Sequence, residues 1–110
     1  MGPDILQTRI VEQSGFSVLA VVGEIDLAVR DDFDTAVDRA IAIAERGIVV
    51  DMSEVVYLDS TGCNCLVRGS HQAHGRGLDF VVSHPHGLAR RVLELTGLFE
   101  EFCLPERDVV

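Results

Sequence analysis

The stretch IVVDMSEVVYLDSTGCNCL (residues 48–66) decides the fold, because it passes from a buried strand into a helix. Its first residues, IVVDM (48–52), are a short apolar run, which is typical of a strand covered on both faces. Asp59 and Ser60 are residue types preferred at helix starts, so we expect a helix to begin near Thr61. The inner stripe of that helix, mostly small residues that allow close approach to a sheet, is Gly62, Cys65, Leu66, Gly69 and Ala73.

Upstream of this stretch, the pattern predicts two strands and one helix. Residues 5–13 mix polar and apolar side chains on one face, as an edge strand does, whereas FSVLAVV (16–22) is apolar on both faces. A serine-glycine turn separates the two, so they are predicted to form a hairpin. Apolar residues at spacings of three and four predict a helix over residues 30–46, which Arg46 and Gly47 are expected to close.

Downstream of it, LDFVV (78–82) predicts a further strand, and a third helix is expected to stop at Gly97. One last short strand is expected around Phe102–Leu104. The order is then β-β-α-β-α-β-α, with that strand as an addition, so parallel βαβ units follow an antiparallel hairpin. The sequence predicts an α/β fold: a single domain over residues 1–110, with a core of about 5–104 and a mixed sheet of four to five strands.

Composition and charge restrict the functions of this domain. The chain has 110 residues, 47% of them hydrophobic, and 18 acids against 9 bases give a formal net charge of −9. Nucleic-acid binding is not expected, because phosphate contacts need clustered cations. No apolar stretch approaches the ~20 residues that span a bilayer, and the first residues, MGPDILQTR, lack the apolar core of a signal peptide. We expect a cytoplasmic domain without a membrane segment, monomeric when free.

Two acidic segments are predicted to leave the carboxyl ends of parallel strands. Asp26 follows the second strand and Asp59 precedes the central helix, so both would lie near Ser60 if these strands are neighbours. Ser60 then has two interpretations, a plain helix cap or a phosphoacceptor. A phosphoserine adds about −1.5 to −2 charges, here beside Asp59. Such a charge would change a docking surface without unfolding the domain.

Three stretches resemble the STAS domain of bacterial anti-sigma factor antagonists: VVGEIDLA (21–28), VVDMSEVVYLDSTGCNCL (49–66) and VLELTGLFEEF (92–102). The Asp-Ser-Thr-Gly motif at residues 59–62 is the most specific part of a likeness that runs from the first strand to Phe102. Cys63 and Cys65 depart from the family's pattern, which commonly has aliphatic residues at these places. The resemblance implies a STAS-like fold and a partner-switching role.

For this chain the resemblance implies a phosphorylation switch at Ser60, with Thr61 as the less favoured acceptor. In the family, an ATP-dependent anti-sigma factor kinase phosphorylates this serine, and a metal-dependent serine phosphatase reverses the step. The unphosphorylated antagonist binds the anti-sigma factor and frees the sigma factor, whereas the phosphorylated form lets go. Asp26 carries over as the aspartate beside the site. The protein would then be a kinase substrate, with no cofactor and no enzymatic activity of its own.

The predicted partner-binding surface extends from the motif along the central helix. Arg68 is expected to be exposed there beside Asn64 and Gln72, in the mildly basic part of the chain. The full predicted set is Asp26, Asp59, Ser60, Thr61, Gly62, Asn64 and Arg68. The alternative function is a STAS binding or scaffold module outside sigma control, such as a small-ligand sensor or a subunit of a complex.

The cysteines and histidines have plain interpretations. Cys63 and Cys65 are predicted to be small buried hydrophobes, and they lie about 200° apart around a helix, so they cannot bridge each other. A redox-sensing disulfide from either of them to Cys103 is the alternative. His71 and His74 share a helix face, but no pattern of zinc ligands accompanies them, so no metal site is predicted.

Overall fold

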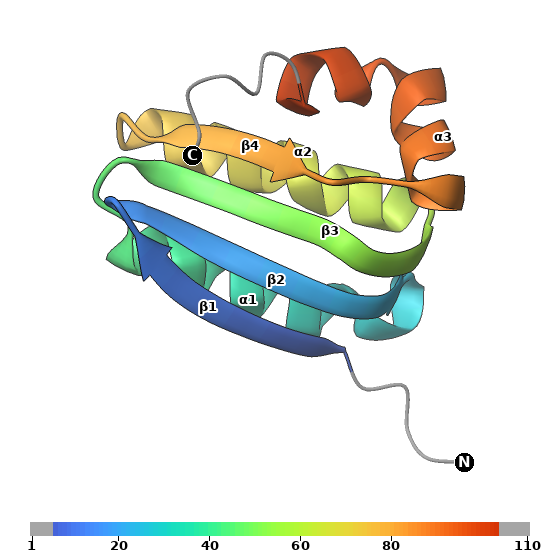
Figure 1. The fold of residues 1–110 in the computed structure, drawn as a ribbon, viewed down its shortest axis with the longest axis horizontal. Coiled ribbons are helices and arrows are strands. Elements are labelled where there is room, and N and C mark those ends of the chain that lie inside the picture. The colour runs from blue at the N-terminus through green and yellow to red at the C-terminus, as the bar shows by residue number, and fades with distance from the viewer. Residues whose placement is uncertain (1–5, 104–110) are drawn as a thin grey trace.

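The computed structural model describes residues 6–103, and a mixed four-stranded sheet lies at its centre (Figure 1). The strands lie side by side in chain order: β1 (Gln7–Gln13), β2 (Phe16–Ile25), β3 (Gly47–Leu58) and β4 (Asp79–Ser83). β1 pairs antiparallel with β2, whereas β2 with β3 and β3 with β4 are parallel. The predicted α/β fold with an opening hairpin is therefore confirmed.

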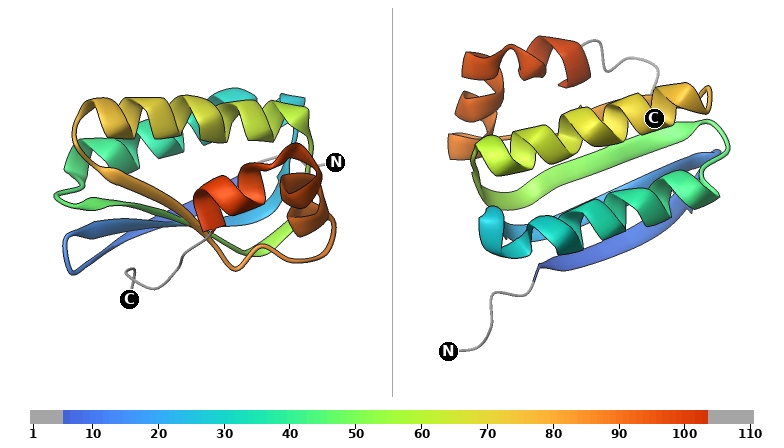
Figure 2. Two further views of the ribbon diagram at one scale, coloured as in Figure 1. Left: turned by 90° about the horizontal axis from the view of Figure 1, so that it is seen from above. Right: turned by 180° about the vertical axis from the view of Figure 1, so that it is seen from behind.

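Helices cover one face of the sheet and one of its edges (Figure 2). α1 (Arg30–Ile43) and α2 (Ser60–Gly75) lie on the same face, as two successive right-handed crossovers require. A 3-10 turn, η1 (Leu27–Val29), leads from β2 into α1. α3 (Gly87–Thr96) and a turn of π-helix, η2 (Phe99–Cys103), lie beside β4 and cover the edge of the sheet. Within residues 6–103, no helix has the length and apolar character needed to cross a membrane.

The main core lies between the sheet and these helices. Large side chains from both layers are fully buried in it, among them Leu19, Phe33, Ile48, Leu66 and Leu93. The inner stripe predicted for α2 is buried throughout, and its glycines allow close approach: a Cβ on Gly69 would lie 2.7 Å from Val37 Cγ1. Gly69 therefore brings the middle of α2 close to α1, and a Cβ there would also lie 3.2 Å from the Phe80 ring of β4.

β2 continues past the predicted Val22 to Ile25, and two further predicted element ends were also wrong. β3 continues to Leu58 instead of ending near Met52, and two register shifts against β2 curl its second half. α1 ends at Ile43 and not at Arg46, because the Arg46 amide donates to the Gly15 carbonyl of the hairpin turn (2.8 Å) and has left the helical ladder. In both cases a contact with a distant segment decides where the element ends.

The predicted last strand was also wrong. Phe102 and Cys103 belong to η2, and the Phe102 ring packs edge to face on Phe80 of β4, with ring centroids 5.4 Å apart. This segment therefore covers the edge of β4 with side chains and does not pair with it. Leu104 lies outside the described residues, as do the ends of the predicted domain and its core.

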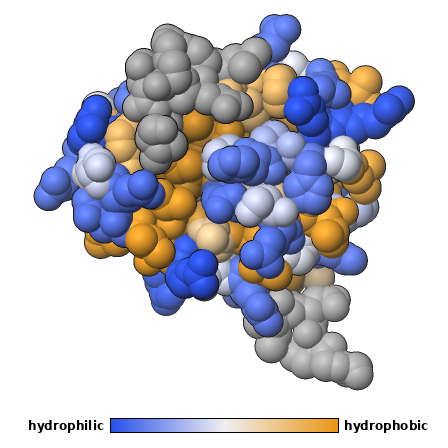
Figure 3. Space-filling model, viewed as in Figure 1, coloured by the Kyte–Doolittle hydropathy of each residue, from blue (hydrophilic) through white to orange (hydrophobic). Residues whose placement is uncertain are grey.

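The other face of the sheet has no helix on it in the described part of the chain, and Figure 3 looks onto this face, where apolar and polar side chains are mixed. The strand register places one valine from each strand in a single row across it: Val11, Val18, Val49 and Val81. Phe16 packs with Val49 beside this row, and the Arg46 guanidinium lies over the Phe16 ring, 5.1 Å from its centroid. The acidic motif residues gather elsewhere, at the carboxyl ends of β2 and β3.

Candidate functional site

Two carboxylates cap helical turns at the carboxyl ends of β2 and β3. Ile25 and Leu58 are paired across these parallel strands, so the residues that follow them, Asp26 and Asp59, lie at the same end of the sheet. Asp26 Oδ1 accepts a hydrogen bond from the amide two residues later, at the start of η1 (3.1 Å). Asp59 Oδ1 does the same at the start of α2 (3.0 Å). The strands are neighbours, which is the condition under which the sequence places both acids near Ser60, and each acid is a helix cap.

Ser60 is the first residue of α2, and its side chain is exposed. Because Asp59 is the N-cap, the serine hydroxyl does not cap the helix, and it makes no hydrogen bond within residues 6–103. The first turn closes with a bond from the Cys63 amide to the Asp59 carbonyl (3.0 Å). A helix N-terminus favours negative groups. The plain-cap interpretation of Ser60 is therefore wrong, and its hydroxyl is free at a position that suits a phosphate.

Tyr57 also belongs to this site, although the sequence analysis did not single it out. Its hydroxyl donates a hydrogen bond to Asp59 Oδ2 (3.2 Å), so both oxygens of that carboxylate are engaged. That hydrogen bond raises the pKa of the Tyr57 phenol, and the charge of Asp59, some desolvation, and the charges of Asp26 and Glu24 add to the rise. The one signal in the sequence was its place two residues before Asp59, since alternate residues of a strand point to the same side.

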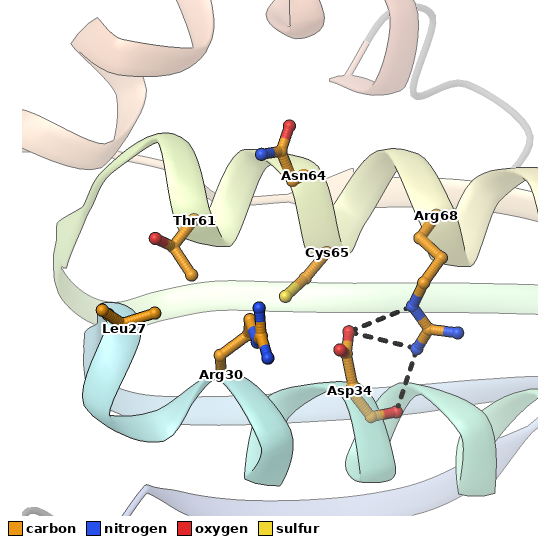
Figure 4. A pocket seen from close by; sticks show the side chains of 7 residues that line it. All are labelled: Leu27, Arg30, Asp34, Thr61, Asn64, Cys65 and Arg68. Atoms are coloured by element: carbon orange, nitrogen blue, oxygen red, sulfur yellow. Dashed lines mark hydrogen bonds and ion pairs between the residues drawn. The ribbon is translucent and has the colours of Figure 1, made fainter.

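A groove of about 230 Å³ lies between α1 and α2 beside the first turn of α2 (Figure 4). Its walls are formed by Leu27, Arg30, Asp34, Thr61, Asn64, Cys65 and Arg68. Arg30 reaches from α1 toward the α2 wall, where Thr61 and Cys65 lie. Three residues of the predicted partner-binding surface, Thr61, the exposed Asn64 and Arg68, are thus brought together on one side of a groove.

Arg68 is only partly exposed, although the sequence predicted an exposed side chain, and its place in the partner-binding surface stays a prediction. Its Nη2 lies 3.1 Å from Asp34 Oδ1 and 3.2 Å from Asp38 Oδ1, both on α1, and its Nε donates to Asp34 Oδ1 (3.2 Å). The side chain is 39% exposed, so one edge still borders the groove. Its main contact is therefore an ion-pair clasp between α1 and α2.

Gly62 lies inside the fold. It is buried, and a Cβ at this position would collide with Leu58 and Ile25, the last residues of β3 and β2. The glycine of the motif therefore serves close packing of α2 on the strand ends. The motif divides between an accessible part, Asp59 with Ser60 and Thr61, and this buried residue beneath them.

The three cysteines are buried, and no disulfide joins them. Burial raises the pKa of Cys65 to about 12, and a hydrogen bond to Asp34 and its charge add to the rise. Burial and the charge of Asp59 raise the pKa of Cys63, although a hydrogen bond with α3 opposes the rise. Since the thiolate is the reactive form, neither thiol is activated. Both pack as buried side chains, as predicted, and a redox disulfide with Cys103 stays a prediction.

Comparison with known proteins places the chain in a family. The model of the STAS domain matches residues 7–109. The chain belongs to the STAS domain family. This STAS domain is 30% identical over 102 residues to the anti-sigma-F factor antagonist RsfB of Mycobacterium tuberculosis, which covers 93% of this chain and 83% of the relative.

Solved structures share the fold of this STAS domain. An anti-sigma factor antagonist from Mycobacterium paratuberculosis matches it with a TM-score of 0.80 at 28% identity, over 92% of this chain and 86% of that chain. The Bacillus cell fate determinant SpoIIAA in its phosphorylated form matches with a TM-score of 0.64 at 19% identity, over 86% and 85% of the two chains. The second likeness concerns the fold alone. The family resemblance carried by the sequence motifs is confirmed.

Proposed function

We propose that this STAS domain is an anti-sigma factor antagonist whose partner binding is switched off by phosphorylation of Ser60. The names of the relatives support the class of function. The observation that carries the switch is the exposed and unpaired hydroxyl of Ser60 at the N-terminus of α2, next to a cap that Asp59 provides. A serine that served as the cap would have to break that bond before it could react.

In the proposed phosphoryl transfer, this STAS domain supplies only the acceptor hydroxyl of Ser60. The bond between the γ-phosphorus and the bridging oxygen of ATP breaks, a bond to Ser60 Oγ forms, the hydroxyl proton passes to a base of the kinase, and ADP leaves. In this proposal the anti-sigma factor is both the partner and the kinase. A metal-dependent serine phosphatase restores the hydroxyl by hydrolysis and releases inorganic phosphate. Because ATP is the donor, we assign the cycle to the cytoplasm.

The surface around Ser60 suits a protein partner. Leu27 and Leu95 are 69% and 78% exposed. Leu27 lines the groove together with Thr61, and Leu95 precedes Thr96, whose side chain is hydrogen-bonded to Cys63 in the first turn of α2. Two exposed leucines thus flank the start of α2 on opposite sides. They offer the apolar area that a protein interface buries around a polar centre.

A phosphate at this centre would oppose binding through its charge. It brings about −1.5 to −2 charges to a cluster that already holds Glu24, Asp26 and Asp59. The partner's active site contains the phosphates of ATP, so the phosphorylated serine would have to be desolvated against like charge. A difference of about 2.8 kcal/mol between the two forms changes the affinity a hundredfold.

Calorimetry with Ser60 variants tests the proposal. Ser60→Ala is expected to bind the anti-sigma factor with or without ATP, and Ser60→Glu to bind at least about tenfold more weakly, which corresponds to about 1.4 kcal/mol. Ser53, an exposed serine of β3, supplies the matched controls Ser53→Ala and Ser53→Glu, which should bind like the unchanged protein. Phosphopeptide mapping from the native host should place the phosphate on Ser60 and not on Thr61. Binding that is indifferent to both Ser60 changes would favour a scaffold or sensor module outside sigma control.

A further inference from the structure

The contact between Tyr57 and Asp59 links the end of β3 to the start of α2. Asp59 Oδ2 accepts the phenolic hydrogen at 3.2 Å, while Oδ1 accepts the Thr61 amide hydrogen at 3.0 Å. One donor comes from the strand and the other from the helix, so a rotation of the carboxylate would break both bonds. Tyr57 therefore fixes the side chain that caps α2.

This arrangement affects Ser60, which lies in the chain between Asp59 and Thr61, the acceptor and the donor of the capping hydrogen bond. A serine beside a mobile carboxylate can donate its hydroxyl hydrogen to it, and such bonds to charged acceptors are roughly twice as strong as neutral ones. Here both oxygens of Asp59 are engaged, and the Ser60 hydroxyl makes no hydrogen bond within the described residues. A kinase can therefore phosphorylate the Ser60 hydroxyl without first breaking a hydrogen bond to Asp59.

A phenol also suits the charges at this place. Tyr57 lies in the field of Asp59, Asp26 and Glu24, whose negative charges disfavour its ionisation, so it remains a donor at neutral pH. A lysine or arginine could hold the carboxylate as well, but it would cancel part of the negative charge. The neutral phenol orders Asp59 and leaves intact the acidic cluster on which the proposed switch depends.

We propose that Tyr57 is a positioning residue for the phosphorylation of Ser60: its hydroxyl holds Asp59 in place as the cap of α2 and thereby keeps the Ser60 hydroxyl unpaired and ready for the kinase. The inference rests on the proposed function. Because Tyr57 acts through Asp59, removal of its hydroxyl should slow phosphoryl transfer more than it weakens binding of the unphosphorylated form.

The contact itself can be measured without a partner. The chain has one tyrosine and no tryptophan, so the alkaline phenol absorbance reports on Tyr57 alone. The unchanged protein should titrate above the usual phenol value of about 10. Asp59→Asn, which keeps a capping side chain but removes the charge, should titrate at lower pH. In Tyr57→Phe, amide hydrogen exchange at Thr61 should be faster. Equal titration in the unchanged protein and Asp59→Asn would overturn the proposal.

The kinetic experiment follows phosphorylation of Ser60 by the anti-sigma factor kinase, with Tyr57→Phe as substrate. We expect kcat to fall about fivefold, the effect of one lost hydrogen bond, while KM and the Kd of the unphosphorylated complex change less than about twofold. Thr96→Val is the matched control. This change removes an α3 hydroxyl that is hydrogen-bonded to Cys63 and makes no hydrogen bond to Asp59, so it should leave kcat unchanged. Circular dichroism confirms that each variant is folded.

The outcomes separate this inference from the proposed function. If Tyr57→Phe and the unchanged protein are phosphorylated at the same rate, the positioning role is overturned and the switch stands. If binding falls in parallel with the rate, Tyr57 contacts the partner directly, and the positioning role is again overturned. If the unchanged protein is bound but never phosphorylated at Ser60, the proposed function fails, and this inference fails with it.

Discussion

At the end of the sheet where β3 begins, which we call the closed end, backbone groups make most of the closing contacts. The amides of Glu45 and Arg46 both donate to the Gly15 carbonyl (3.1 and 2.8 Å), and the Asp79 amide donates to the Arg46 carbonyl (3.0 Å). Gly47 is buried among these segments, where there is no room for a side chain. Within residues 6–103, the hairpin turn, the loop between α1 and β3 and the start of β4 are thus tied to one another.

At the opposite end, which we call the Ser60 end, acidic side chains do this work. Asp26 and Asp59 each hold one turn, and Tyr57 holds Asp59. Backbone closure is the same in any chemical state of the side chains, whereas closure by half-buried carboxylates leaves charge and the unpaired Ser60 hydroxyl near the surface. This difference explains why the proposed phosphorylation of Ser60 would alter partner recognition without disturbing the fold.

The largest effect is expected at the closed end, from Gly47→Ala. A Cβ there would lie 2.7 Å from the Phe16 ring and 2.8 Å from the Asp79 carbonyl oxygen, and backbone cannot give way as a side chain can. We expect a loss of about 2–3 kcal/mol in the free energy of unfolding, measured with urea. Gly75→Ala, with no atom within 4 Å of its Cβ, is the control and should not destabilise. Phosphorylation of Ser60 at low temperature should be unaffected by Gly47→Ala.

The next largest effect is expected from removing one carboxylate at each end of the sheet. Asp59→Ala removes the cap of α2, and Glu12→Ala removes the carboxylate that accepts the Gly15 amide hydrogen in the hairpin turn (2.7 Å). Each is expected to cost about 1 kcal/mol in urea unfolding. Only Asp59→Ala should change the rate at which Ser60 is phosphorylated. A similar rate change in Glu12→Ala would show that stability, and not the local geometry of the Ser60 end, governs the reaction.

A smaller effect is expected from the clasp between the helices. Arg68→Gln loses the ion pairs with Asp34 and Asp38, but these groups are partly exposed, so the expected loss is at most about 1 kcal/mol. The difference between Arg68→Gln and the unchanged protein should shrink in high salt. Arg39→Gln, on the exposed side of α1, serves as the control. Unchanged stability together with a tenfold loss of partner affinity would show that Arg68 acts in partner binding and not as a clasp.

The smallest effect on the free energy of unfolding at neutral pH is expected from the ionisation of Cys65, which occurs only at alkaline pH. The pKa of Cys65 is raised to about 12 in the folded chain, so folding favours the neutral thiol. The corresponding stability is fully present below the ordinary thiol pKa of about 9 and is lost as the pH rises toward 12. The raised pKa of Tyr57 adds a loss above pH 10. Cys65→Ser should flatten the decline of the unfolding free energy between pH 9 and 12, and an unaltered slope would contradict the assignment.

Local patterns in the sequence determined the order of strands and helices, the place of an acid just after β2 and just after β3, and the buried stripe of α2. These features depend on periodicity and on short-range preferences that each segment carries in itself. The same is true of the Asp-Ser-Thr-Gly motif, whose place between a strand and a helix is evident from residues 48–66 alone.

Only the tertiary structure decided what the individual side chains of the site do. Arg68 is engaged by acids 30 and 34 residues away, so its exposure could not be judged from its own helix. Phe102 packs on Phe80 and does not extend the sheet. Asp59, and not Ser60, caps α2, and its second carboxylate oxygen accepts the hydrogen bond from Tyr57. Such roles depend on partners brought together by folding, and spacing along the chain does not contain them.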